Sequence, residues 1–256
     1  MDSVLFHPSG SSAPSFLPDP VHGRVFTVTR AIRSSEVTAG GRLRLDALAR
    51  YLQDAAEDDL ADSGWDEPCD WLVRRVSVAI GGYPARGDQL SLRTFCSATG
   101  PRWAERTTTV SRSGTDLMQA VAVWAAVGRE DGRPVPLGPA FHRLYGGAAQ
   151  GRTVSARLSH PGPPGPPGRA WPLRASDFDT AGHVNNAIAW AAAEDVLAGL
   201  DWLPGRGELE YRRPILPGYD VRLTASHVPG QLSCWLLNGP QLLASAQLSR
   251  GTPGPG

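Results

Sequence analysis

Residues 176–190 read SDFDTAGHVNNAIAW, and the stretch changes character at Asn186. Before that residue, carboxylates, an imidazole, two amides and a glycine stand close together. After it, the run AIAWAAAEDVLAGL places Ile188, Ala192 and Val196 four residues apart, which is the spacing of one helical face. We therefore predict a polar turn that leads directly into a buried helix.

An internal repeat links this stretch to the first half of the chain. An offset of 141 residues brings Glu36 onto Asp177 and Gly41 onto Gly182, and it brings QD at 53–54 onto ED at 194–195. In each half, a strand, a glycine turn and a helix precede four strand-like runs. Two unrelated α+β domains are the alternative that the pattern leaves open.

The strand-like runs are rich in β-branched residues and are separated by turn signals. Strands are expected at 24–36, 71–80, 89–98, 104–113, 117–127, 171–177, 209–215, 220–228, 231–238 and 241–249. The first helix has Leu45, Leu48, Leu52 and Ala55 on one stripe, and the second spans 186–200. These elements predict an α+β fold in which two antiparallel sheets each wrap a central helix and pair as a pseudo-dimer.

The expected domain boundaries follow the Pro, Gly and Ser content. Residues 1–22 form a disordered N-terminal tail, and residues 146–170 form a linker whose Pro/Gly run suits neither a helix nor a central strand. Residues 23–145 and 171–250 are then the two domains, and 251–256 is a tail.

Composition narrows the class of protein. The net charge is zero, which gives no reason to expect nucleic acid or a membrane surface as a partner. The three cysteines are far apart and form no CxxC pair, so we expect neither a disulfide framework nor a metal site. No apolar run reaches the ~18 residues of a membrane-spanning helix, and the N-terminus lacks a secretory pattern. We expect a cytoplasmic protein without membrane insertion.

The polar turn is the candidate active site. Asp179 can act as a general base or attack an acyl carbon, and His183 can donate a hydrogen bond or a proton. The Gly182 amide, beside a helix N-terminus, can stabilise an oxyanion, while Asn185 and Asn186 can cap the helix and hold the loop. The same residues also suit purely structural roles, such as an Asx-turn at Asp179.

The repeat favours the functional interpretation. Under the 141-residue offset, Thr38 and Arg42 stand where Asp179 and His183 stand in the second half. A turn that needed a carboxylate and an imidazole only to fold should need them in both halves.

The stretch SDFDTAGHVNNAIAW resembles the loop of hotdog-fold thioesterases, in which D-x-D-x-x-G-H-V-N-N precedes the central helix. Longer segments resemble fatty acyl-ACP thioesterases, including IRSSEVTAGGRLRLDALARYLQDAAEDDL, AVAVWAAVGREDGRPVPL and LEYRRPILPGYDV. The resemblance implies a double hotdog that hydrolyses acyl-ACP, in fatty acid biosynthesis, without cofactor or metal. It also implies acyl carrier protein as partner, to a monomer or a homodimer of double hotdogs.

The chain departs from the plant-type pattern at three positions. Ala181 stands where the D-x-N-x-H loop has Asn, and Pro214 and Ile215 stand where the YRREC strand has Glu and Cys. Asn185 or a first-half residue such as Gln53 would then supply the missing hydrogen bond. What remains resembles the carboxylate site of the 4-hydroxybenzoyl-CoA thioesterase branch.

These departures leave several alternatives open. An acyl-CoA substrate, a non-catalytic acyl-binding protein and a hotdog dehydratase all stay possible, although we find no dehydratase motif of the H-F-P or H-x-x-x-G-x-x-x-x-P type. Because the carrier protein is acidic, an arginine rim is expected at the pocket mouth. Its candidates are Arg74, Arg75, Arg212 and Arg213.

Overall fold

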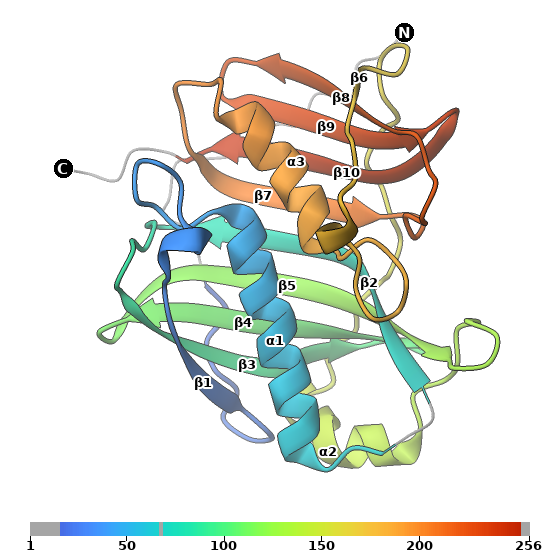
Figure 1. Ribbon diagram of the computed structural model, residues 1–256. Helices are drawn as coiled ribbons and strands as arrows, with labels where there is room; N and C mark the ends of the chain where they lie inside the picture. Colours follow the sequence, from blue (N-terminus) through green and yellow to red (C-terminus); the bar gives the residue numbers. More distant parts are fainter. Residues whose placement is uncertain (1–15, 67–68, 252–256) are drawn as a thin grey trace, which may run out of the picture.

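One antiparallel sheet runs through both halves of the chain in the computed structural model (Figure 1). The structure describes residues 16–66 and 69–251, and within them the sheet has ten strands in the order β1-β3-β4-β5-β2-β7-β10-β9-β8-β6. The two sheets expected from the sequence therefore join at their edges. Within the same residues, no helix is long and apolar enough to cross a membrane.

The first half holds five strands and two helices. They are β1 (Phe26–Ala31), α1 (Leu45–Ser63), β2 (Cys69–Ile80), β3 (Gln89–Thr99), β4 (Trp103–Arg112), β5 (Thr115–Gly128) and α2 (Pro139–Ala149). The second half holds β6 (Arg169–Ala170), α3 (Ala187–Leu197), β7 (Pro204–Tyr211), β8 (Val221–Val228), β9 (Gln231–Asn238) and β10 (Gln241–Arg250). Two short 3-10 turns, η1 (Ser34–Glu36) and η2 (Ala175–Asp177), precede the central helices.

The halves meet where β2 pairs with β7, from Arg75 opposite Glu210 to Ala79 opposite Arg206. Gly207 sits in this junction because a Cβ there would lie 3.3 Å from the Trp190 ring, closer than most side-chain contacts. The buried apolar residues of both halves form one continuous core. The molecule is thus a double hotdog.

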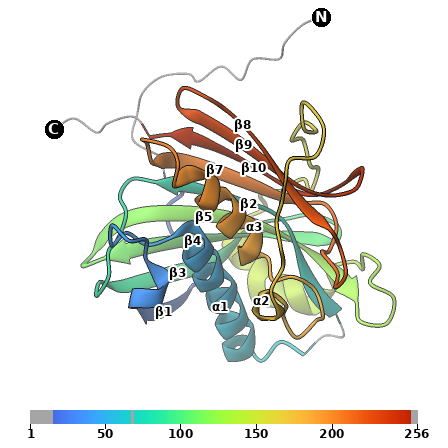
Figure 2. The same cartoon turned by 45° about the horizontal axis from the view of Figure 1, so that its top comes forward.

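Helices α1 and α3 lie on the same face of the sheet, and the sheet curves around them (Figures 1 and 2). The predicted stripe of α1 is buried as expected: Leu45, Leu48, Leu52 and Ala55 are all at most 8% exposed. On α3, alanine-rich turns allow the helix to approach the strands closely, and Trp190 is 2% exposed. Burial of these apolar faces is the main stabilising contribution from both helices.

The structure confirms the 141-residue repeat at the level of hydrogen bonds. In the first half, Thr38 N donates to Arg42 O at 2.9 Å, and in the second half Asp179 N donates to His183 O at 2.9 Å. The 3-10 turns η1 and η2 also occupy equivalent positions. The two turns before the central helices therefore have the same backbone and differ in their side chains.

Several sequence predictions differ from the structure. The strand expected at 209–215 is β7, which runs instead from Pro204 to Tyr211. The linker was expected to begin at residue 146, but α2 continues to Ala149 and packs its aromatic side chains beside β3. No strand forms over 171–177: the two-residue β6 ends at Ala170, Pro172 lacks an N–H, and the backbone then turns into η2. In the expected N-terminal tail, residues 1–15 lie outside the described residues, but Leu17 exchanges two backbone hydrogen bonds with the Gln119 side chain, at 2.7 and 2.8 Å.

Candidate active site

The turn from Asp179 to Gly182 closes on itself before α3 begins. Gly182 N donates to Asp179 O at 3.0 Å, and Gly182 adopts φ +75°, which a residue with a side chain rarely takes. Gly41 has the matching φ of +84° in the first half. The glycine is therefore required by the backbone of both turns.

This turn corrects one expectation about the oxyanion. The Gly182 amide was predicted to be free for a ligand, but it is consumed by the Asp179 carbonyl. Among the described residues, the Asn186 amide takes no hydrogen-bond partner, and it stands directly before the first residue of α3. Asn186, not Gly182, thus offers the amide beside the helix N-terminus.

The Asp179 carboxylate is half-buried and held by its own turn. Its Oδ1 accepts from Ala181 N at 3.0 Å and from His183 N at 3.4 Å, so the Asx-turn alternative describes this oxygen correctly. The structure gives Oδ2 no partner within the residues it describes. The turn therefore fixes the carboxylate and leaves one oxygen available for chemistry.

The His183 side chain lies in the same cavity wall as Asp179. The two residues are joined through their backbones, and within the described chain the imidazole makes no hydrogen bond to the carboxylate. The structure thus brings both groups to one cavity without forming a preassembled pair.

Asn185 and Asn186 hold the start of α3. Asn185 Oδ1 accepts from Ala187 N at 2.9 Å, which is a side-chain cap of the helix. The Asn186 carbonyl accepts from the Tyr211 hydroxyl at 3.0 Å. Asn185 also donates its Nδ2 to Gln53 Oε1 at 3.4 Å, which places the first-half residue proposed from the sequence in contact with the loop.

A cavity of about 480 Å³ runs from this loop along α1 and the first-half strands. The loop end is lined by Asp179, His183, Asn185 and Asn186. The other end reaches an aromatic cluster formed by Trp71 of β2 with Phe141 and Tyr145 of α2. The helix α2 was not predicted, so its part in the cavity could not be expected from the sequence.

Three of the four arginines expected at the pocket mouth line the cavity. Arg74, Arg212 and Arg213 line the cavity, whereas Arg75 does not. Neighbouring side chains of a strand point to opposite faces, and Arg74 is also the extra residue of a β-bulge between Val73 and Arg75, so the two arginines reach different places. Arg75 instead donates to the carbonyls of Arg157 and Ser155, at 3.0 and 3.4 Å.

The equivalent turn of the first half is closed by an ion pair. The Arg42 guanidinium pairs with the Glu194 carboxylate, whose Oε2 also accepts from Leu45 N at 3.0 Å. The Arg42 side chain is 17% exposed and that of Glu194 is 10% exposed. Arg42 and Glu194 therefore form a structural junction, and Arg42 stands where the second half has the cavity-lining His183.

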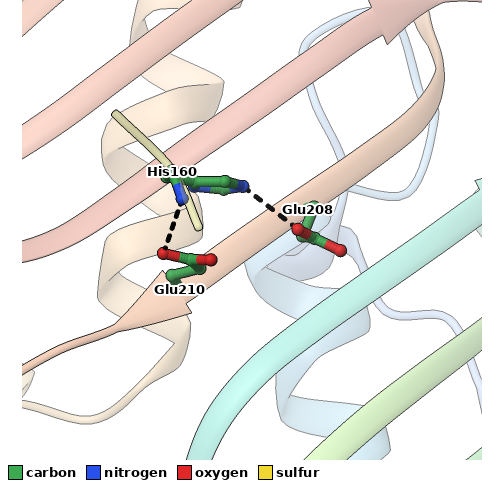
Figure 3. Close-up of side chains that lie close together, drawn as sticks. All are labelled: His160, Glu208 and Glu210. Atoms are coloured by element: carbon green, nitrogen blue, oxygen red, sulfur yellow. Dashed lines mark hydrogen bonds and ion pairs between the residues drawn. The ribbon is translucent and has the colours of Figure 1, made fainter. Parts of the chain in front are cut away.

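Another titratable cluster, His160 with Glu208 and Glu210, could hold a metal by its donor types (Figure 3). The atoms that could bind a metal already have hydrogen-bond partners. Glu210 accepts from His160 N at 3.1 Å and from Arg212 Nη2 at 2.9 Å, and His160 Nε2 lies 3.2 Å from Glu208 Oε1. The Arg212 guanidinium also disfavours a bound cation. The cluster fixes His160, in the segment that connects the two halves, to strand β7.

Two of the three cysteines, Cys69 and Cys96, line the cavity. Burial raises the pKa of the Cys96 thiol to about 11 and that of the Cys234 thiol to about 12. At neutral pH these two thiols are protonated, and they are therefore poor nucleophiles.

Comparison with known proteins agrees with this geometry. The chain matches, over residues 23–145, the family model of the acyl-ACP thioesterase N-terminal domain. An uncharacterized protein of Mycobacterium tuberculosis is 25% identical over 236 residues, covering 90% of this chain and 94% of the relative. A chloroplastic palmitoyl-acyl carrier protein thioesterase of Gossypium hirsutum is 30% identical over 121 residues, covering 42% of this chain and 29% of that protein.

Solved structures share the fold over nearly the whole chain. A 12:0-ACP thioesterase from Umbellularia californica superposes with a TM-score of 0.75 at 22% identity, covering 90% of this chain and 98% of the other. An acyl-ACP thioesterase from Bacteroides thetaiotaomicron gives 0.72 at 18% identity, covering 88% and 97%. The class defined by this fold is the double-hotdog protein. The sequence match over residues 23–145 assigns the chain to the acyl-ACP thioesterase family.

Proposed function

We propose that this protein hydrolyses fatty acyl-ACP to a free fatty acid and the carrier thiol, in cytoplasmic fatty acid biosynthesis. The observation that carries the proposal is the common cavity, which joins Asp179 and His183 at one end to an apolar, aromatic-lined space at the other. An acyl chain in that space would present its thioester to the loop.

The reaction requires a base and a proton donor at the thioester. Asp179 takes a proton from water as the water oxygen attacks the carbonyl carbon, or its Oδ2 attacks that carbon directly. In either course the carbon–sulfur bond breaks, and the thiolate leaves with a proton from His183. Direct attack adds an acyl-enzyme step that water then resolves.

The negative charge that develops on the carbonyl oxygen needs a donor. The Asn186 amide lies at the N-terminal end of α3, where the helix dipole also favours negative charge. Its carbonyl is held by Tyr211 and its neighbour Asn185 caps the helix, so the peptide has a fixed orientation.

The charge of the cavity lining supports an acidic carrier protein as the acyl donor. Arg74 and Arg213 line the cavity beside the loop, and basic groups there suit the acidic surface of an acyl carrier protein. Burial, followed by the neighbouring Arg212, lowers the pKa of Arg74 from its ordinary value. Coenzyme A carries phosphates that the same arginines would bind, so carrier choice needs a direct comparison.

The test is release of free thiol from a panel of acyl-ACP and acyl-CoA substrates of varied chain length. Faster turnover of acyl-ACP, with release of fatty acid and thiol in equal amounts, supports the proposal. Binding without thiol release would support the acyl-binding alternative, and conversion of hydroxyacyl thioesters to enoyl thioesters would support a dehydratase.

A further inference from the structure

Helices α1 and α3 lie side by side on one face of the sheet (Figure 1). Each sends a polar side chain to the start of the other helix. From α3, Glu194 accepts from Leu45 N at the first residue of α1 and pairs with Arg42. From α1, Gln53 accepts from Asn185 Nδ2, just before α3 begins. Gln53 and Glu194 are equivalent under the 141-residue repeat, so the same position on each central helix reaches the start of the other helix, although the atoms it contacts there differ.

A carboxylate one turn along α1 sets the orientation of the Gln53 amide. Gln53 Nε2 donates to Glu57 Oε1 at 3.0 Å, and a carboxylate only accepts, so Gln53 Oε1 must face Asn185. Asn185 then donates through Nδ2 and presents Oδ1 to the Ala187 amide, at 2.9 Å. A chain of hydrogen bonds thus runs from Glu57 through both amides to the first turn of α3.

The two halves use this contact differently because their charges differ. Glu194 meets an arginine, and the resulting ion pair seals its turn. Gln53 is neutral and half-buried, and it lines the cavity together with Asp179 and His183. A carboxylate at position 53 would have no arginine partner, because His183 occupies the position equivalent to Arg42. It would also add negative charge beside Asp179. A neutral amide can hold Asn185 without either consequence.

We infer that Gln53 is a positioning residue of the hydrolytic site, which fixes the Asn185 cap and with it the first turn of α3 against the cavity. The inference rests on the proposed function, because the positioned groups act on a thioester. It assigns to the first half of the chain a direct part in a site whose reactive residues all lie in the second half.

The test compares Gln53→Met, which keeps the length of the side chain but removes both hydrogen bonds, with wild type. We expect kcat for acyl-ACP to fall on the order of tenfold or more, with KM within about twofold, because small misplacements of a catalytic loop are costly. Hydrogen exchange at the Ala187 amide should become faster. Gln53→Glu should also lower kcat, since it removes the donor to Glu57 and adds a negative charge to the cavity that Asp179 lines.

Glu194→Gln is the matched control, because it makes the equivalent residue neutral in the sealed half. It should lower the melting temperature and leave kcat and its pH profile unchanged. Wild-type kcat together with wild-type Ala187 exchange in Gln53→Met would overturn the inference. If wild type releases no thiol, the proposed function fails, and the exchange at Ala187 still decides whether Gln53 positions α3.

Discussion

The ion pair between Arg42 and Glu194 fills the place in the first half that His183 and Gln53 fill in the second. The two turns share their backbone hydrogen bonds, so the difference lies in the side chains. A buried guanidinium–carboxylate pair closes one turn, whereas the other opens to the cavity. The two equivalent turns are therefore one structural junction and one candidate active site.

Removing one partner of this ion pair should destabilise the protein. Glu194→Ala leaves Arg42 without its carboxylate and Leu45 N–H without its acceptor. We expect the free energy of unfolding to fall by about 3–5 kcal/mol, measured by urea denaturation. Asp195→Ala is the control, because its pair with Arg169 is about half exposed and should contribute under about 1 kcal/mol. Equal losses in the two variants would contradict a buried junction.

Thiol chemistry should be dispensable for turnover. Replacing Cys69, Cys96 and Cys234 together with Ala should leave kcat/KM within about threefold of wild type, since burial keeps Cys96 and Cys234 protonated at neutral pH. The measurement is acyl-ACP hydrolysis by the folded triple variant. Complete inactivation of wild type by an alkylating reagent that modifies a single cysteine would contradict this expectation.

Restoring an amide at position 181 should be tolerated. Ala181 is exposed, and only its backbone amide is used, as a donor to Asp179 Oδ1 at 3.0 Å. Ala181→Asn should therefore keep or raise kcat, because Gln53 already holds Asn185 from the other half. Steady-state kinetics beside a circular dichroism spectrum would check this. A large loss of kcat in folded protein would show that the loop needs a small residue here.

The free energy of unfolding should fall at acid pH, because the contact between Glu208 of β7 and His160 is lost there. The hydrogen bond with His160 and that with Ser77 lower the pKa of Glu208 from its ordinary value of 4.5, against an opposing effect of burial. A lowered pKa means that the stabilisation is present above pH 4.5 and is lost as the pH falls through the folded-state value. Glu208→Gln should therefore flatten the dependence of unfolding free energy on pH below about 4.5. An unchanged acid slope would exclude Glu208 as a contributor.

Periodicity and composition were sufficient to predict most of the fold. The apolar stripe beginning at Leu45 and the run beginning at Ile188 each predicted a central helix, because burial on one face leaves a regular spacing. The 141-residue repeat predicted equivalent turns, which the matching backbone bonds at Thr38 and Asp179 confirm. Such features depend on local sequence, so they could be recognised without coordinates.

Features that depend on tertiary contacts could not be predicted. Helix α2 contains Gly146 and Gly147, which weaken intrinsic helix propensity, and it is stabilised by aromatic packing of Phe141 and Tyr145. We expected a free Gly182 amide, because its partner is the backbone carbonyl of Asp179 and residue types do not reveal such a bond. Gln53 could be named as a candidate, but its contact with Asn185 joins residues 132 positions apart.

The account depends most on Asp179 as the reactive carboxylate of a single site, and the direct test is hydrolysis of acyl-ACP by Asp179→Asn beside Thr38→Ala. Asparagine keeps an oxygen that can accept from Ala181 N and His183 N, so the turn should persist while the base is lost. We predict a fall in kcat on the order of 10²–10⁴-fold for Asp179→Asn and near wild-type turnover for Thr38→Ala, with both variants folded by circular dichroism. Near-full activity of Asp179→Asn, or equal losses in the two variants, would contradict a single Asp179-based site.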